Sequence, residues 1–245
     1  MNIKERLNHI LKRIEEEALD CNRSPDNIQL VAVSKKHTAD HVWSAIESGT
    51  TILGENYVQE AREKIKEIEN FHINKPDIQR PSWHFIGHLQ RNKAKYAVRL
   101  FDLIHSVDNI ELAKALDKCA HKHNKCQHIL IQISTGETSK SGVLPDHLEK
   151  LLKSAMSLTN IAVCGLMVMP PFSENPEDSR LYFQQLAKLL QQIKAISRNQ
   201  TRHPLNHLSM GMTADYPVAI QEGATLIRVG TAIFGPRDGC NIHMK

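Results

Sequence analysis

Two kinds of segment alternate along this chain: short runs that are wholly apolar, and longer stretches in which apolar residues recur every three or four positions. The second pattern places the apolar side chains on one face of a helix. It occurs first between Ile3 and about Leu19 and returns at Ala39–Glu47, Val58–Ile68, Lys93–Val98, Ile110–Ala120, His147–Met156, Ser179–Ile196 and Asp215–Gln221. We predict a helix in each of these segments.

The short apolar runs predict eight strands, at Ile28–Val33, Thr51–Leu53, Trp83–Ile86, Leu100–Ile104, Ile129–Ile133, Ala162–Met167, Leu205–Leu208 and Thr225–Val229. Runs that are apolar throughout, rather than at every second residue, indicate a sheet covered on both faces. Each strand is followed by a predicted helix or the start of one. We therefore predict an α/β fold, a single TIM (β/α)8 barrel with an extra N-terminal helix, forming one domain over residues 1–245.

A doubly wound open sheet is the structural alternative. It would have fewer strands and usually a glycine-rich turn after the first of them. Here the first strand ends in Ser34-Lys35-Lys36-His37, which contains no glycine. The polar stretch from Asn70 to Pro81 is predicted to be a surface loop of the same domain.

Net charge, cysteine count and the N-terminal segment argue against several classes of protein. The formal net charge of the 245 residues is only +4, too small to indicate nucleic acid as the main partner. The five cysteines are odd in number and form no C-x-x-C pair, which argues against a disulfide framework and a zinc ribbon. The N-terminus is charged and amphipathic, unlike a signal peptide, and no apolar run could span a bilayer. We expect a cytoplasmic protein without a metal, membrane or nucleic-acid partner.

In a barrel of this type, ligands bind at the carboxyl ends of the strands, and a phosphate commonly lies in the loops after the last two. The segments at those two places are Ser209-x-Gly211-x-Thr213 and Gly230-Thr231. Glycine lets the backbone approach the phosphate, while hydroxyls and the free N–H groups of a helix N-terminus donate to it. These two segments predict a phosphate cradle.

Lys35 closes the first apolar run, so it is expected at the mouth of the barrel. A lysine that forms a Schiff base must first lose a proton, and burial or nearby cations such as Lys36 and Arg228 would lower its pKa. The pattern alone leaves Lys35 and Lys36 as alternatives, because successive strand residues point to opposite faces. An amine and a phosphate cradle in one cleft suit pyridoxal 5′-phosphate (PLP), an aldehyde that carries a phosphate.

Arg228 lies within the last apolar run, where a charge is rarely unpaired. One interpretation is a buried ion pair with Glu55 or Glu222. The other is a partner for the ring nitrogen of PLP, since arginine or aspartate takes that place in PLP sites. An arginine would leave the ring nitrogen unprotonated and would weaken the cofactor as an electron sink.

At these residues the chain resembles the pyridoxal phosphate homeostasis protein family. The matching segments, in order, are Val31-Ala32-Val33-Ser34-Lys35, Gly54-Glu55-Asn56-Tyr57-Val58-Gln59-Glu60, Trp83-His84-Phe85-Ile86-Gly87-His88-Leu89-Gln90, Ser139-Lys140-Ser141-Gly142, Gly165-Leu166-Met167, Ser209-Met210-Gly211-Met212 and Arg228-Val229-Gly230-Thr231-Ala232-Ile233-Phe234-Gly235.

The resemblance implies a barrel like the N-terminal domain of alanine racemase, with PLP in a Schiff base on Lys35. It further implies the positions of the other site residues. Asn56 would lie beside the cofactor, Arg228 would face the ring nitrogen, and the phosphate would be held by Ser209, Gly211, Gly230 and Thr231. Thr213-Ala214-Asp215 stands where the family commonly has Ser-Asp-Asp, so Thr213 is expected to donate its hydroxyl and Asp215 to cap the following helix.

The function that we predict is storage and delivery of PLP in the cell, without robust catalysis. The expected partners are PLP and apo PLP-dependent enzymes, and we expect a monomer. Lys140, in a loop after the fifth strand, is either a solvated lysine or a contact for the phosphate of a passing cofactor. One alternative is a fold-type III PLP enzyme such as an amino-acid racemase, for whose second domain we expect no room after the eighth strand. Another is a PLP-free barrel that binds a phosphorylated metabolite.

Overall fold

The computed structural model describes residues 1–137, 141–196 and 201–235. Its strands are β1 (Gln29–Val33), β2 (Ile52–Glu55), β3 (Ser82–Phe85), β4 (Leu103–Val107), β5 (Gln127–Ile133), β6 (Ile161–Val168), β7 (His207–Ser209) and β8 (Leu226–Val229). All pair in parallel, in chain order, and β8 pairs with β1 to close the barrel. The predicted α/β barrel is confirmed.

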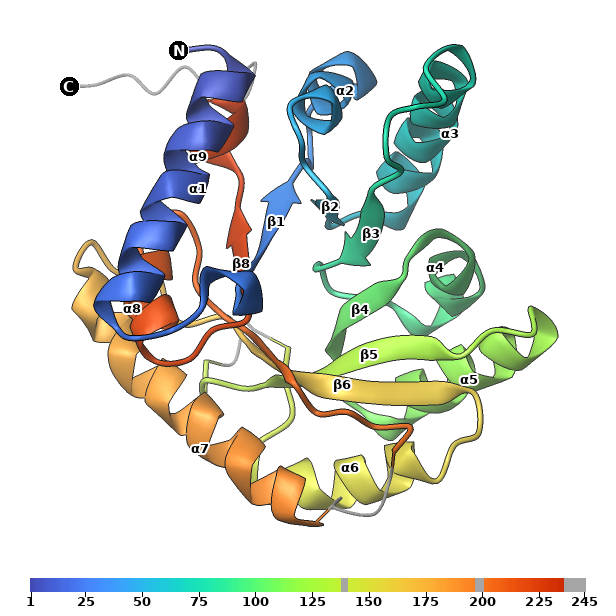
Figure 1. Cartoon of the computed structure of the whole chain (residues 1–245). Coiled ribbons are helices and arrows are strands. Elements are labelled where there is room, and N and C mark those ends of the chain that lie inside the picture. Colours follow the sequence, from blue (N-terminus) through green and yellow to red (C-terminus); the bar gives the residue numbers. More distant parts are fainter. Residues whose placement is uncertain (138–140, 197–200, 236–245) are drawn as a thin grey trace.

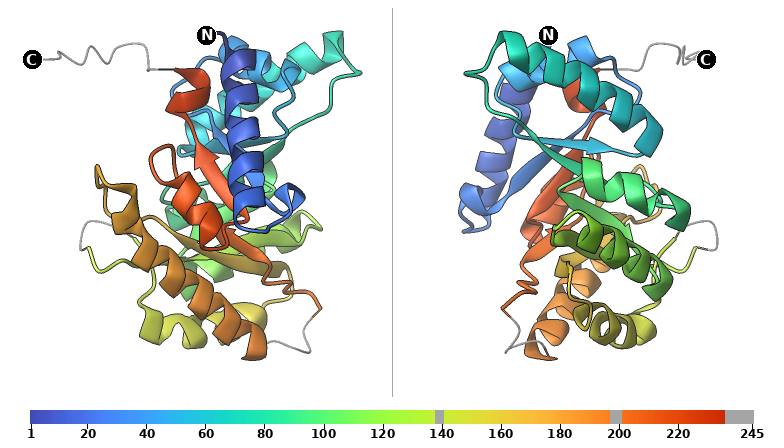
Figure 2. Two further views of the ribbon diagram at one scale, coloured as in Figure 1. Left: turned by 60° about the vertical axis from the view of Figure 1, so that its left-hand side comes forward. Right: turned by 90° about the vertical axis from the view of Figure 1, so that its right-hand side faces the viewer.

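The helices follow one another around the outside of the barrel (Figure 1). They are α1 (Ile3–Asp20), α2 (Ala39–Glu47), α3 (Val58–Asn74), α4 (Ala94–Leu100), α5 (Ile110–Lys122), α6 (Leu148–Met156), α7 (Arg180–Ile196), α8 (Tyr216–Gln221) and α9 (Thr231–Phe234). The predicted extra helix, α1, starts in a capping box between Asn2 and Glu5 and packs against α8, α9 and α2 (Figures 1 and 2). Among the described residues, no helix is both long and apolar enough to cross a membrane.

Several element boundaries differ from the prediction for reasons of packing. Helix α3 continues to Asn74, so the loop predicted from Asn70 is wrong in its first part. The continuation buries His72, whose ring contacts Trp43 edge-on at 4.7 Å between centroids. Strand β4 starts at Leu103 instead of Leu100, because Leu100 ends α4. The short helix α9 was not predicted, since four residues carry no periodic signal.

Inside the barrel, apolar side chains from several strands form one buried cluster. It consists of Val31, Ile52, Leu103, Leu130, Ala162, Cys164, Met167 and Leu226. Two residues further along their strands, and so on the same face, Leu103 is followed by His105 and Leu226 by Arg228. The interior therefore becomes polar toward the carboxyl ends of the strands, where the candidate site lies.

Candidate functional site

A cavity of about 170 Å³ opens at the carboxyl ends of the strands. It is lined by Val33, Lys35, His37, Asn56, Ile86, Met167, Met169, Met212, Thr213, Arg228, Gly230 and Thr231. Six of the eight predicted site residues line this cavity, and only Ser209 and Gly211 do not. The structure thus brings a lysine, an arginine and two hydroxyl-bearing loops from β1, β7 and β8 to one place.

The structure favours Lys35 over Lys36 as the amine of this site. Lys35 is half-buried and lines the cavity. Lys36 is exposed, has a left-handed backbone (φ +64°) and is not among the lining residues. The turn that follows β1 thus directs one of the two neighbouring lysines into the cavity.

Behind Lys35, a buried ionic cluster fixes the end of β1. Lys64 of α3 donates from Nζ to the backbone oxygen of Ser34 at 2.7 Å and to Oε1 of Glu55 at 2.6 Å. The Ser34 hydroxyl donates to the same carboxylate oxygen at 2.7 Å. The side chain of Lys64 is 5% exposed and that of Glu55 is 0% exposed, so these charges have almost no access to water.

The cluster also extends to the residue after Lys35. Glu60 accepts from Nζ of Lys64 at 2.9 Å and from the backbone N–H of Lys36. Burial raises the pKa of Glu55, and the nearby ammonium of Lys64 opposes that rise. Residues on both sides of Lys35 are therefore held by Lys64 and its two carboxylates, a role that the sequence analysis missed.

The loops after β7 and β8 form the other end of the cavity. Gly230 caps the N-terminus of α9, whose first backbone N–H groups have no acceptor within the helix. A Cβ at Gly230 would lie 3.2 Å from the backbone oxygen of Val33, a tight contact, so glycine leaves room for the close approach of β1 and β8 here. Thr213 and Thr231 add hydroxyl groups to the lining. This end of the cavity has the donors that a phosphate needs.

Asp215 acts differently from the expectation. It occupies the N-cap position of α8, yet its side chain makes no capping hydrogen bond. Its carboxylate instead accepts from the backbone N–H of Met212 at 2.7 Å and from the hydroxyl of Ser179 at 2.8 Å. Asp215 therefore stabilises the loop after β7 and ties it to the start of α7.

Gly211 shapes this loop without lining the cavity. Its φ is +86°, and a Cβ there would lie 2.6 Å from the Cβ of Ala219 on α8. We predict that Gly211→Ala lowers the free energy of unfolding by about 2–4 kcal/mol, the sum of a left-handed alanine and a steric overlap. Gly49→Ala is the matched control, because φ is +104° with nothing within 4 Å, and should cost about 1 kcal/mol. Equal losses in urea denaturation would contradict the steric argument.

Arg228 does not form the ion pair that was one of its two interpretations. Glu55 pairs with Lys64 and Glu222 with Arg180, and no ion pair of Arg228 occurs among the described residues. Nη1 donates to the hydroxyl oxygen of Ser209 at 2.5 Å, and Nη2 donates to the backbone oxygen of Val168 at 3.0 Å. Burial lowers the pKa of Arg228 to about 10, and the negative charge of Asp215 partly opposes that change. The guanidinium therefore stays charged near neutral pH.

Ser209 and two histidines lie beneath the cavity. Ser209 is fully buried, and its hydroxyl contacts Arg228 and Nδ1 of His105, the latter at 2.8 Å. Nε2 of His105 lies 3.1 Å from Nδ1 of His84. The hydroxyl that was predicted to reach the phosphate is therefore engaged deeper in the barrel. Neither histidine was predicted to belong to the site, although both lie in or beside apolar strands.

The neutral state of His84 predicts a dependence of stability on pH. Burial lowers its pKa from 6.5 to about 4, with Asp102 raising it and His207 lowering it further. The unfolded chain thus binds the proton more tightly, so stability is full above pH 6.5 and falls as the pH drops toward 4. Between pH 7 and pH 5 we expect His84 alone to account for a loss of about 2 kcal/mol. In urea titrations at the two pH values, His84→Gln should lose less free energy of unfolding than the wild type, by that amount. The same loss in the variant and the wild type would contradict this.

Asn56 lines the cavity, whereas Tyr57 and Tyr216, which follow the carboxyl ends of β2 and β7 in the sequence, do not. Asn56 lines the cavity, and its buried Oδ1 has no hydrogen-bond partner among the described residues. Tyr57 is 55% exposed, Tyr216 is buried, and neither lines the cavity. Lys140 lies outside the described residues, so its two interpretations stay as they were.

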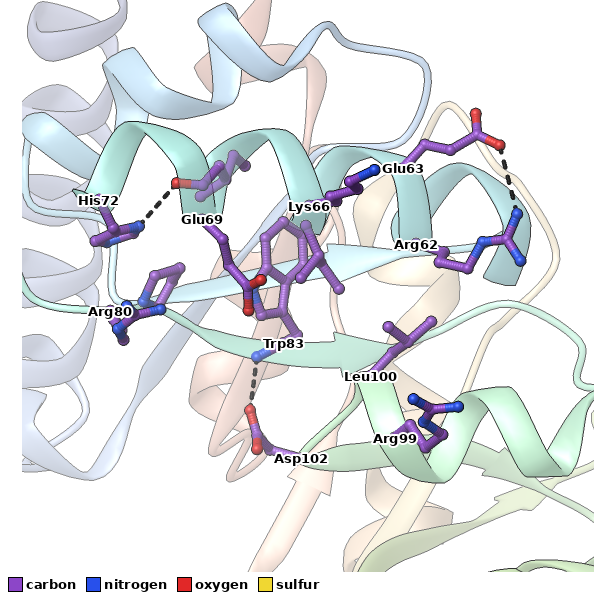
Figure 3. A pocket seen from close by; sticks show the side chains of 13 residues that line it. Arg62, Glu63, Lys66, Glu69, His72, Arg80, Trp83, Arg99, Leu100 and Asp102 are labelled. Atoms are coloured by element: carbon purple, nitrogen blue, oxygen red, sulfur yellow. Dashed lines mark hydrogen bonds and ion pairs between the residues drawn. The ribbon is translucent and has the colours of Figure 1, made fainter. Parts of the chain in front are cut away.

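A larger cavity of about 650 Å³ lies on the outer wall, against α3, α4 and the start of β3. Figure 3 shows charged side chains of both signs along this cavity: Arg62, Lys66, Arg80 and Arg99 with Glu63, Glu69 and Asp102. This cavity contains neither Lys35 nor the loops after β7 and β8. The smaller cavity at the barrel mouth is therefore the candidate site.

A family model and several known proteins match this chain over nearly its whole length. The family model of the alanine racemase N-terminal domain matches residues 8–238. The "Pyridoxal phosphate homeostasis protein" of Aquifex aeolicus is 39% identical over 238 residues, covering 97% of this chain and 99% of that protein. The protein of the same name from Escherichia coli K12 is 36% identical over 239 residues, covering 97% of each chain.

Two solved structures place the barrel among known folds. PipY of Synechococcus elongatus with PLP bound is 34% identical, with a TM-score of 0.80 over 96% of this chain and 100% of that chain. An alanine racemase of Clostridium difficile is 16% identical, with a TM-score of 0.65 over 58% of its own length, and shares the fold alone. On the family model and the near full-length relatives together, this chain belongs to the pyridoxal phosphate homeostasis protein family, whose barrel is that of the alanine racemase N-terminal domain.

Proposed function

We propose that this protein binds PLP at the mouth of the barrel and serves to store and deliver it. One observation carries the proposal: the amine of Lys35 and the phosphate-binding loops at Thr213 and Gly230-Thr231 line a single cavity. The family gives independent support, because PipY has been solved with PLP bound and the curated relatives are named for PLP homeostasis. The phosphorylated-metabolite alternative leaves the lysine of this cavity unused.

The residues present fit the chemistry of PLP. The cofactor supplies an aldehyde that condenses with an amine, releasing water, and a phosphate that anchors the other end. Lys35 provides the amine, and Thr213, Gly230 and Thr231 provide hydroxyl and backbone donors for the phosphate. The unpartnered Oδ1 of Asn56 gives the cavity a free acceptor.

Arg228 is the residue that we assign to the ring nitrogen. It is charged, buried and among the lining residues, and nothing acidic pairs with it in the described part of the chain. A guanidinium only donates hydrogen bonds and does not readily give up a proton. A ring nitrogen facing it would stay unprotonated, which makes the bound cofactor a poor electron sink and favours carriage over catalysis.

The lining also lacks the acid and base pair of a racemase. Its titratable side chains among the described residues are Lys35, His37 and Arg228, and the imidazole of His37 stacks on Phe234 at 4.9 Å. A racemase of this fold type needs acid and base groups on both faces of the substrate carbon, one of them a tyrosine. Neither Tyr57 nor Tyr216 lines the cavity. The racemase alternative therefore has less support than the carrier.

Transfer to an acceptor tests this function. Protein loaded with PLP is mixed with an apo PLP-dependent enzyme, and the gain of acceptor activity is timed against release of PLP from the loaded protein alone. A carrier transfers faster than PLP is released into buffer. Transfer no faster than release would contradict delivery, and substantial racemisation of an amino acid by the same preparation would favour the enzyme.

We further propose that the protein acts as a cytoplasmic monomer that hands PLP to apo PLP-dependent enzymes. The free thiols of Cys21, Cys119, Cys126 and Cys164 support a reducing compartment.

A further inference from the structure

A chain of hydrogen bonds crosses the barrel interior beneath the candidate site. It runs from Arg228 on β8 to Ser209 on β7, then to His105 on β4 and His84 on β3, with separations of 2.5, 2.8 and 3.1 Å. None of the four side chains is more than 5% exposed. Four strands thus contribute one buried polar residue each, and only Arg228 reaches the cavity.

The direction of the protons in this chain follows from what each group can donate. A guanidinium has donors only, so the oxygen of Ser209 must accept from Arg228. Among the contacts of the described residues, the single hydroxyl proton of Ser209 then has one acceptor, Nδ1 of His105. His105 consequently carries its proton on Nε2 and donates it to Nδ1 of His84. Every proton points away from the arginine.

The opposite direction leaves a donor unsatisfied. If Nδ1–H of His105 donated to Ser209, the serine proton would have no acceptor among the contacts of the described residues. Ser209 is fully buried, so water cannot replace that acceptor, and a buried donor without a partner is costly. The same directional argument requires neutral imidazoles, and burial lowers the pKa of His84 to about 4 and that of His105 well below its usual value.

We propose that His105 and His84 are positioning residues for Arg228, and that they hold its guanidinium toward the ring nitrogen of PLP by keeping the Ser209 hydroxyl turned away from it. Successive hydrogen bonds in one direction polarise one another, which strengthens the bond that Ser209 accepts from Arg228. The backbone oxygen of Val168 holds the second Nη, so the guanidinium plane is fixed at two points. This inference rests on the proposed function, because it takes the ligand of Arg228 to be PLP.

The first test uses the protein without PLP. Nitrogen-15 NMR distinguishes the two neutral tautomers of a histidine. We expect His105 and His84 both as the Nε2–H tautomer near neutral pH. His105 as the Nδ1–H tautomer, or as a charged imidazolium, would overturn the proposed direction of the chain.

The second test uses variants loaded with PLP. His105→Leu removes the acceptor of the Ser209 proton, whereas His105→Asn retains an acceptor oxygen close to the position of Nδ1. We expect His105→Leu to release PLP about tenfold faster than the wild type and to shift its absorbance in the same direction as Arg228→Met. His105→Asn should stay within about twofold of the wild type. His84→Leu serves where His105→Leu does not fold, with a smaller effect of the same sign.

The outcomes separate this inference from the proposed function. One outcome would overturn the positioning role alone. In it, borohydride reduction attaches PLP covalently to the wild type, and His105→Leu and His84→Leu match the wild type in absorbance spectrum and in the rate of PLP release. Failure of the wild type to bind PLP would contradict the proposed function and the positioning role with it. Loss of PLP from His105→Asn and His105→Leu alike would mean that the histidine only fills space.

Discussion

Lys35→Ala is expected to lose PLP when the loaded protein is passed through a desalting column, whereas the wild type retains it. In the proposed function the amine is one of two points of attachment for PLP, and the loops at Thr213 and Gly230-Thr231, which line the same cavity, are the other. When one of two linked attachments is removed, retention falls by about 100-fold or more. The variant should still fold, because Lys35 is half-buried just after a strand and is not a member of the apolar core.

Lys36→Ala is the matched control for this experiment. The two lysines are adjacent, yet Lys36 is exposed and outside the cavity lining. We expect Lys36→Ala to retain PLP as the wild type does, with retention measured by absorbance of the protein fraction. Equal retention by Lys35→Ala and the wild type, or loss from Lys36→Ala alone, would contradict the assignment of the amine.

Lys64→Met is expected to destabilise the protein by about 3–5 kcal/mol, the usual cost of breaking a buried ion pair on one side. The substitution leaves the fully buried carboxylate of Glu55 without its cation and the backbone oxygen of Ser34 without its donor. It should also weaken PLP binding, since the residues that flank Lys35 lose their shared anchor. Urea denaturation and PLP retention measure the two effects.

Two controls test whether the loss of stability comes from the buried, unpaired carboxylate of Glu55. The double variant Glu55→Gln with Lys64→Met removes the orphaned charge and should recover a large part of the loss. Lys153→Met breaks a pair with Glu149 in which the side chains are 62% and 56% exposed, and should cost less than about 1 kcal/mol. A comparable cost for Lys64→Met and Lys153→Met would show that the buried cluster has no special role.

The fold was predictable because its signals are periodic and local. The stripe of Leu7, Ile10, Leu11, Ile14 and Ala18 predicts α1. Four of these five residues are buried in the structure, whereas Leu11 lies at the edge of the stripe and is exposed. The apolar runs predict the strands for the same reason. Placement of the mouth residues followed from the fold, because parallel strands of a barrel present all their carboxyl ends on one side.

The supporting residues of the site were not predictable in this way. Glu60 and Lys64 are four residues apart in α3 and look like an exposed helical pair in the sequence, yet Lys64 is buried against the end of β1. His84 and His105 gave no signal, because a histidine in an apolar strand has many possible partners. Ser209 was assigned to the phosphate from its loop position, whereas its contacts with Arg228 and His105 depend on strands far apart in sequence.

Borohydride reduction of the PLP-loaded wild type, followed by proteolysis and mass spectrometry of the peptides, identifies the lysine that binds the cofactor. Reduction makes the bond between cofactor and lysine permanent, so the modified residue can be identified. We expect one dominant adduct, on Lys35. An adduct on Lys36, or no adduct on any lysine, would contradict it.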